Sequence, residues 1–344
     1  METIQRKNIS LQILRGIAAT TVMFLHVFQY LGIKPLGDFY ISGQYSVDIF
    51  FILSGYLIYI TTKPTTRTKS YFKKRCFRIY PMYITALILY LCFNIYVLNE
   101  NYGIKILVQN FLMFPWDSYW SYNSLIVGVA WSTLFELNFY FLFFLIIFFK
   151  WNKRSIFLII PLLFFLSYFL VKYEYVKDNI PFISLIISLW KTPYVYLFVI
   201  GCLVGEFYPK NILPKFSKGV YTLLLILSII LFFGAHSFKY NLFYSLFASS
   251  FLFVSFLIFE NYYSLNIKNK LIKLMNYLGD ISFSIYLLHI LVIKALMICL
   301  HIDSFYLMII LTTIITLSLS VFTYEFIEKK FIALAKSDSK KIKQ

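Results

Sequence analysis

An arginine and a histidine lie within the first apolar segment, where charge is costly because lipid cannot solvate it: RGIAATTVMFLHV at residues 15–27. Arg15 and His26 are eleven positions apart. In a helix that spacing is close to three turns, so both side chains share one face, about 16 Å apart along the axis. A guanidinium suits phosphate and an imidazole can act as a base or nucleophile. The pair predicts a polar path along one helix, although a histidine that only bonds a neighbouring helix would give the same pattern.

The second apolar segment carries a carboxylate in SVDIFFILSGYLI. Asp48 lies about one turn inside the opposite face, at a depth similar to that of His26. We therefore predict a pair in which Asp48 orients the His26 imidazole. Ser54 and Gly55 follow in the same segment, where small residues allow either close helix packing or backbone contact with a ligand.

A basic stretch, YFKKRCFRIYP, precedes the third apolar segment. Arg75 and Arg78 are three residues apart, which places them on one face if the stretch is helical. Two guanidinium groups so placed form a fork suited to phosphates. Ordinary topology signals and contacts with anionic lipids explain the same charges.

Further polar residues occur inside later apolar segments. Glu136, in GVAWSTLFELNFYF, lies near the middle of its segment and is expected to need Arg15, a histidine, Lys191 or water nearby. Tyr286 and His289, in ISFSIYLLHIL, have the i, i+3 spacing that places them on one helix face. Glu325 and Glu328 are predicted to pair with basic residues near the inner end of the last segment.

The composition indicates a helical integral membrane protein. Of the 344 residues, 60% are hydrophobic, 21% aromatic and 14% charged, and the mean hydropathy is +0.75. A soluble domain of this length does not need so much apolar material. The four cysteines lie far apart and show no metal-site spacing, so no metal is expected. We predict a single domain over residues 1–344.

Windows of about 20 apolar residues predict the membrane spans. We expect ten, at residues 10–31, 44–62, 79–98, 126–149, 155–171, 183–207, 219–235, 241–260, 281–300 and 305–325. The apolar segment 103–114 is too short to cross and is assigned to the interface, next to the aromatic cluster PWDSYWSYN. The first span lacks a small-x-small cleavage site and is expected to remain in the protein.

The basic residues predict the orientation. With a cytoplasmic N-terminus, 24 of the 32 lysines and arginines lie in inner segments and five in outer ones. An even number of spans then places both termini in the cytoplasm, with a short solvated tail over 329–344. The net charge of +17 is spread over the inner loops, which argues against nucleic-acid binding.

Six stretches, in order, resemble the membrane-bound acyltransferase 3 family, which acylates bacterial surface carbohydrates. They are LQILRGIAATTVMFLH, SVDIFFILSGYLI, RCFRIYPMY, WSTLFELNFY, SFSIYLLH and FTYEFIEKKF. Departures from the family pattern include Ser46 for glycine, Tyr56 for phenylalanine and Lys330 for proline. In the fourth stretch, the spacing from Trp131 to Glu136 is kept while the threonine is displaced by one position.

The resemblance implies a ten-span enzyme of the bacterial cytoplasmic membrane. It implies transfer of an acetyl group from acetyl-CoA to a carbohydrate hydroxyl, with no permanently bound cofactor. Polysaccharide-assembly proteins are possible partners, and no extracytoplasmic hydrolase domain is expected. The implied site comprises catalytic residues (His26, Asp48, Glu136), acyl-CoA contacts (Arg15, Arg75, Arg78, Ser54, Gly55) and acceptor or path-lining residues (Trp131, Tyr140, Tyr286, His289).

Three alternatives stay open at this point. One is transfer of a succinyl or other acyl group to an exopolysaccharide. Another is a carrier or flippase for a lipid-linked glycan, which would use the same polar path without chemistry. The third is an inactive relative that serves as an assembly partner. Within the enzyme class, direct transfer and an acyl-histidine intermediate both fit the residues.

Overall fold

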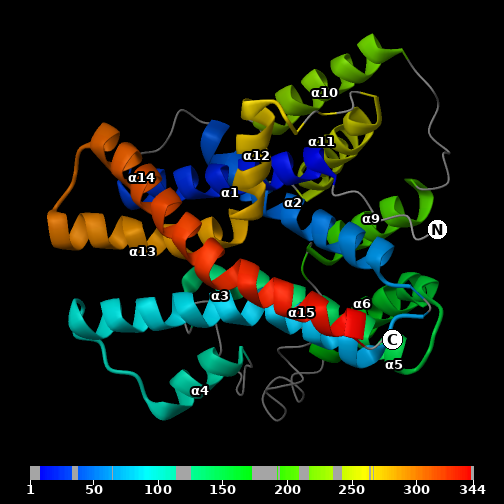
Figure 1. Cartoon of the computed structure of the whole chain (residues 1–344), viewed down its shortest axis with the longest axis horizontal. Coiled ribbons are helices and arrows are strands. Elements are labelled where there is room, and N and C mark those ends of the chain that lie inside the picture. Colours follow the sequence, from blue (N-terminus) through cyan, green and yellow to red (C-terminus); the bar gives the residue numbers. More distant parts are fainter. Residues whose placement is uncertain are drawn as a thin grey trace. The chain divides into compact units, whose positions relative to one another are not determined.

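The structure is a computed structural model, and helices joined by turns and short irregular segments make up the part of the chain that it describes. It describes residues 8–32, 38–63, 65–113, 125–172, 192, 194–208, 217–234, 242–262, 265 and 267–341. No strand occurs among these residues. The helices are α1 (Ile9–Tyr30), α2 (Asp38–Thr61), α3 (Thr68–Tyr96), α4 (Ile104–Leu112), α5 (Trp131–Phe148), α6 (Ile156–Lys172), α9 (Tyr194–Phe207), α10 (Lys218–Phe233), α11 (Leu242–Tyr262), α12 (Lys270–Asp280), α13 (Ser282–Leu300), α14 (Phe305–Thr323) and α15 (Lys329–Lys341) (Figure 1).

Six helical stretches among the described residues are long and apolar enough to cross a membrane. They are Ile9–Tyr30, Thr68–Tyr96, Gly128–Phe148, Phe243–Glu260, Ser282–Leu300 and Phe305–Lys336. Shorter apolar helices occur at Tyr45–Thr61, Tyr194–Phe207 and Lys218–Phe233. The chain is therefore a multi-pass membrane protein, while the expected count of ten spans stays a prediction. The start of the predicted span 183–207 and the cluster PWDSYWSYN lie outside the described residues.

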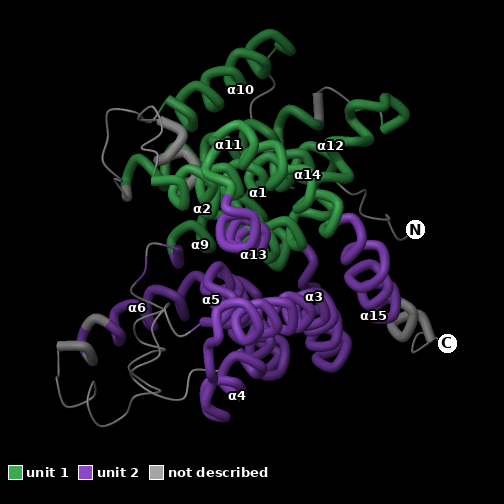
Figure 2. Tube along the Cα trace, turned by 90° about the vertical axis from the view of Figure 1, so that its left-hand side faces the viewer, with its two compact units in different colours: residues 1–59, 196–289, 302–320 green, residues 60–195, 290–301, 321–344 purple. Residues whose placement is uncertain are grey.

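The chain divides into two compact units (Figure 2). Unit 1 comprises Met1–Tyr59, Tyr196–His289 and Ile302–Ser320, and unit 2 comprises Ile60–Val195, Ile290–His301 and Val321–Gln344. Each unit is assembled from segments far apart in the sequence. The prediction of a single domain is not tested by this division.

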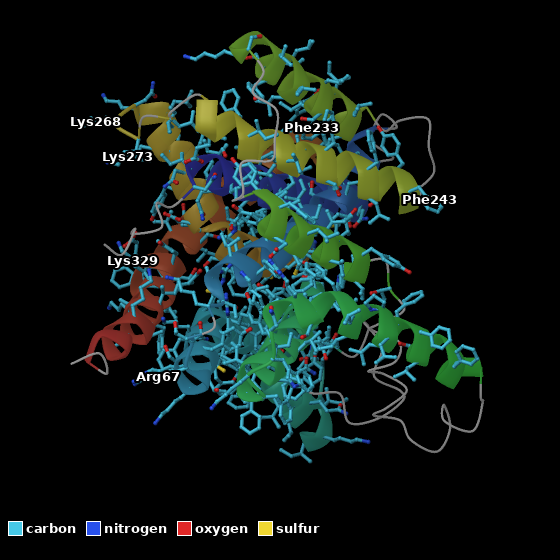
Figure 3. The ribbon with its side chains drawn as sticks, turned by 90° about the vertical axis from the view of Figure 1, so that its right-hand side faces the viewer. Arg67, Phe233, Phe243, Lys268, Lys273 and Lys329 are labelled. Carbon is cyan, nitrogen blue, oxygen red and sulfur yellow. The ribbon has the colours of Figure 1, made fainter. Side chains whose placement is uncertain are left out.

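In unit 1, α1 packs most extensively against α12, and α10 packs beside α11. The α1–α12 crossing is visible in Figure 1. Figure 3 shows Lys268 and Lys273 at one end of this unit and Phe243, at the start of α11, at the other end.

In unit 2, α3 packs against both α5 and α15. The short helix α4 is held beside α3 because the Tyr83 hydroxyl donates to the Asn110 carbonyl at 2.7 Å. The Asn110 side chain in turn accepts from the Ile126 backbone at 2.9 Å.

Two helices, α12 and α15, were not predicted from the sequence. Helix α12 lies where only an inner loop was expected, because its charged and apolar residues alternate around the helix and keep its average hydropathy low. Helix α15 lies within the predicted solvated tail over 329–344, and most of its described side chains are exposed. It continues from α14 through a π-helical segment, Tyr324–Glu328, and packs on α3.

Candidate active site

Helix α1, which carries Arg15 and His26, is anchored at its first turn. The Asn8 side chain accepts from the Leu11 backbone at 2.9 Å and caps the helix. The Ser10 backbone N–H donates to the Glu260 carboxylate at 2.8 Å, and the Ser10 hydroxyl donates to the Phe256 carbonyl at 2.6 Å. The start of α1 is therefore tied to the last turns of α11.

Two glycines let α1 and α12 touch backbone to backbone. A Cβ atom at Gly279 would lie 2.0 Å from the Gln12 carbonyl oxygen. A Cβ atom at Gly16 would lie 2.9 Å from the Gly279 nitrogen. Since Gly16 follows Arg15 directly, this crossing sets the position of the arginine-bearing turn of α1.

His26 meets a second histidine, His289 of α13. The Nε2 atom of His289 lies 3.0 Å from Nδ1 of His26, and the ring centroids are 5.0 Å apart. Each Nδ1 atom also lies 3.0 Å from a backbone carbonyl one turn earlier, that of Val22 for His26 and that of Ile285 for His289. His289 is fully buried. Two imidazoles predicted from separate motifs therefore form one hydrogen-bonded pair inside unit 1.

Tyr286 lies on the same side of α13 as His289, as its spacing predicted. Its ring is 6.1 Å from the His289 ring and 6.0 Å from the Phe50 ring of α2. Because Tyr286 is buried and sits between these two rings, it is part of the wall around the histidine pair.

The predicted pairing of His26 with Asp48 is wrong. The carboxylate accepts a hydrogen bond from the Ser245 hydroxyl of α11 through Oδ2. Its other oxygen, Oδ1, has no hydrogen-bond partner among the described residues. Similar depth in the membrane did not bring the two residues together, because depth says nothing about the direction in which each helix points its side chain. Ser245 carried no sequence signal beyond being a serine in an apolar helix.

Gly55 serves helix packing, one of the two alternatives left open. A Cβ atom at Gly55 would lie 2.1 Å from the Phe198 carbonyl oxygen of α9. A Cβ atom at Gly201 would lie 2.1 Å from the Ile52 carbonyl oxygen of α2. The two glycines form a reciprocal contact, so the backbone at Gly55 faces α9. The neighbouring Ser54 is half-buried.

In unit 2, Arg75 lies between two aromatic rings. Its guanidinium carbon is 4.8 Å from the Tyr140 centroid and 5.4 Å from the Tyr71 centroid. The Tyr71 hydroxyl donates to the Tyr140 carbonyl at 3.1 Å, which ties α3 to α5. Arg75 also donates to the Thr61 hydroxyl at 3.1 Å. The side chain is thus held in place while its surroundings stay partly open.

Glu136 and Arg78 belong to the same cluster. The Tyr140 hydroxyl donates to the Glu136 carboxylate. The charge of Arg78 interacts with Tyr140, Glu136 and Glu328. Arg78 was not among the partners expected for Glu136, yet its charge acts on that carboxylate. Sequence reasoning missed Tyr71, and it named Glu328 only as an acid that would pair with a basic residue.

Trp131 lies in an aromatic group of unit 2. Its ring centroid is 5.1 Å from that of Tyr194 and 5.9 Å from that of Phe135. Its predicted role toward an acceptor sugar is not tested by these contacts.

The π-helical segment carries two acids with different surroundings. Glu328 is 5% exposed and faces the charge of Arg78. Glu325 forms a 2.6 Å ion pair with Lys329, whose side chain is 58% exposed. This ion pair agrees with the predicted pairing of Glu325 with a basic residue. The extra residue in a π turn shifts the side chains that follow it, which is one reason such turns recur at functional sites.

We expect Glu328→Gln to lower the free energy of unfolding by about 1–3 kcal/mol, because it leaves part of the Arg78 charge uncompensated. Thermal unfolding in detergent measures this change. The matched control, Glu325→Gln, should cost less than about 1 kcal/mol because its ion pair is exposed. Equal losses for both variants would contradict the buried role of Glu328.

The fold and these clusters define a class: a multi-pass helical membrane protein with a hydrogen-bonded histidine pair in one unit and an arginine–tyrosine–glutamate cluster in the other. A family model described as an acyltransferase domain, that of acyltransferase family 3, matches residues 8–325. The chain belongs to this family. No curated protein and no solved structure matches it.

Proposed function

We propose that this membrane acyltransferase moves an acetyl group from cytoplasmic acetyl-CoA to a hydroxyl of a surface polysaccharide or of a lipid-linked sugar. The observation that carries the proposal is the hydrogen-bonded pair of His26, on the helix that also bears Arg15, and the buried His289 of α13. The chain that holds this pair matches the acyltransferase family over residues 8–325. An imidazole held in a water-poor site is suited to acyl transfer because water would otherwise compete for the acyl group.

His26 is the proposed catalytic base. Its ring accepts the proton of the acceptor hydroxyl as the oxygen attacks the thioester carbonyl carbon. The carbon–sulfur bond then breaks, and the coenzyme A thiolate takes the proton from the imidazolium. In the alternative route the imidazole nitrogen attacks the thioester carbonyl carbon first, the carbon–sulfur bond breaks and the coenzyme A thiolate leaves. The acceptor hydroxyl then displaces the acetyl group from the acyl-histidine, and the hydroxyl proton passes to the thiolate.

The proposed contacts for the phosphates of coenzyme A are arginines. Arg75 and Arg78 present planar guanidinium groups, which bind phosphate oxygens through two parallel hydrogen bonds. In unit 1, the proposed donor contact is Arg15, which lies about 16 Å along α1 from His26. That separation is comparable to the length of an acyl-pantetheine arm.

The proposed location is the bacterial cytoplasmic membrane, with ten spans and both termini in the cytoplasm. The split of basic residues, 24 inner against five outer, supports this orientation. Lys268 and Lys273, both assigned to the inner side, lie at the opposite end of unit 1 from Phe243 (Figure 3), as such an orientation requires.

The test is acyl transfer by purified protein in nanodiscs, given acetyl-CoA labelled in the acetyl group and the surface glycan of the host. We expect label to leave coenzyme A and to appear in the glycan. Parallel reactions with labelled succinyl-CoA and propionyl-CoA identify the acyl group. Transfer from one of these but not from acetyl-CoA would overturn the acetyl assignment and keep the acyltransferase one.

The carrier alternative has its own readout. Proteoliposomes with a lipid-linked glycan on one side measure its movement without coenzyme A. Movement of the glycan together with no label transfer from any acyl-CoA would overturn the proposed function.

A further inference from the structure

The backbone carbonyls next to the histidine pair fix where its protons lie. A carbonyl oxygen only accepts, so the ring nitrogen that faces it must carry the hydrogen. Nδ1 of His289 faces the Ile285 carbonyl at 3.0 Å and therefore carries a proton. Nδ1 of His26 faces the Val22 carbonyl at 3.0 Å and carries one as well.

These two protons determine which imidazole donates the hydrogen bond between the rings and which accepts it. In a neutral imidazole with a proton on Nδ1, Nε2 is a lone-pair acceptor. Nε2 of His289 is therefore the acceptor, and the Nδ1–H of His26 is the donor across the 3.0 Å contact. The opposite tautomer of His26 would place a bare nitrogen against both a carbonyl oxygen and another lone pair, which is repulsive.

We propose that His289 is a positioning residue that holds His26 as its Nδ1–H tautomer and leaves Nε2 of His26 as the free base. This role rests on the proposed function, in which His26 acts as base. It resembles the part played by the carboxylate in a Ser-His-Asp triad, with a neutral imidazole in its place. Asp48 does not take this part, because its Oδ2 is bonded to Ser245 and its Oδ1 has no partner among the described residues.

The arrangement also serves the step in which His26 becomes charged. When Nε2 takes the proton of the acceptor hydroxyl, the Nδ1 proton stays on His26. Its hydrogen bond to Nε2 of His289 then becomes charge-assisted and shorter. Since His289 is fully buried, no water competes for that bond, and the bond holds the ring plane while the acyl group moves.

The test is nitrogen NMR of protein labelled with ¹⁵N at histidine, which determines which ring nitrogens carry protons. The chain has four histidines, so single His→Gln variants assign each signal. The spectra are recorded at a pH well above 6.5, which is about the ordinary pKa of a histidine side chain, so that the rings are neutral. The nitrogen shifts of a neutral ring then report which of its two nitrogens is protonated. We expect protonated Nδ1 and bare Nε2 in both His26 and His289.

Two variants then separate positioning from packing. His289→Gln keeps an acceptor near the position of Nε2, whereas His289→Leu fills the space without one. We expect His289→Leu to shift His26 toward a mixture of tautomers and to lower kcat by about 10- to 100-fold, with an unchanged KM for acyl-CoA. His289→Gln should retain the His26 tautomer and recover most of kcat. Thermal unfolding checks that both variants fold.

The outcomes distinguish this inference from the proposed function. A proton on Nε2 of wild-type His26 would overturn the inference, and so would a His289→Leu protein with unchanged tautomer and kcat. If no acyl-CoA supports transfer while the expected protons are observed, the proposed function fails and the role of His289 as a catalytic positioning residue fails with it, whereas the hydrogen-bond direction stands.

Discussion

His26→Ala is expected to lower acyl transfer by about 10²- to 10⁴-fold, the range that a positioned general base contributes. If His26 carries the acyl group itself, the loss is at least as large, because no intermediate can form. The measurement is the rate at which label leaves acyl-CoA, with protein in nanodiscs at saturating donor. The side chain is half-buried in α1, so its removal should leave the fold in place.

The control for His26→Ala is a histidine outside the cluster. His301 is exposed and has a φ of +50°, a backbone conformation that asparagine tolerates. His301→Asn should therefore transfer at the wild-type rate. An active His26→Ala protein would remove His26 from its proposed role, and an inactive His301→Asn protein that folds normally would show that loss of activity is not specific to His26.

Gly279→Ala is expected to destabilise unit 1 by about 3 kcal/mol or more, because the added methyl group has no space. Its Cβ atom would lie 2.0 Å from the Gln12 carbonyl oxygen and 2.5 Å from the Gln12 carbonyl carbon. These are backbone atoms of α1, so no rotamer change relieves the clash. Helix α1 must move away from α12, and Arg15 moves with it. Thermal unfolding measures the loss of stability.

Gly128→Ala is the matched control for this substitution. A Cβ atom at Gly128 would have nothing within 4 Å. Gly128→Ala should therefore lower the free energy of unfolding by at most a few tenths of a kcal/mol. A Gly279→Ala protein as stable as Gly128→Ala would show that α1 and α12 do not cross as closely as in the structure.

The sequence by itself determined the membrane class and most helix positions. Long apolar helices stand out in a local average of hydropathy. The predicted spans 10–31 and 281–300 therefore agree within one residue at each end with α1 and α13. Hydropathy missed α12, since an amphipathic helix of eleven residues has no long apolar window. The order of short motifs also indicated the family that the match over residues 8–325 confirms.

Spacing within one helix was equally informative. The i, i+3 rule placed Tyr286 beside His289, and their rings are 6.1 Å apart. The same rule put Arg75 and Arg78 on one part of α3, where both interact with Tyr140. These predictions succeeded because helix geometry alone relates residues a turn apart.

Only the tertiary structure decided which helices supply the partners. Asp48 matched His26 in depth, yet His26 bonds His289 and Asp48 bonds Ser245. Likewise Gly55 gave no sign of whether it faced a ligand or α9 until Phe198 was found against it. A partner depends on the rotation of each helix about its axis and on the neighbour it packs against. Both are set by packing between segments far apart in the sequence, which no local pattern records.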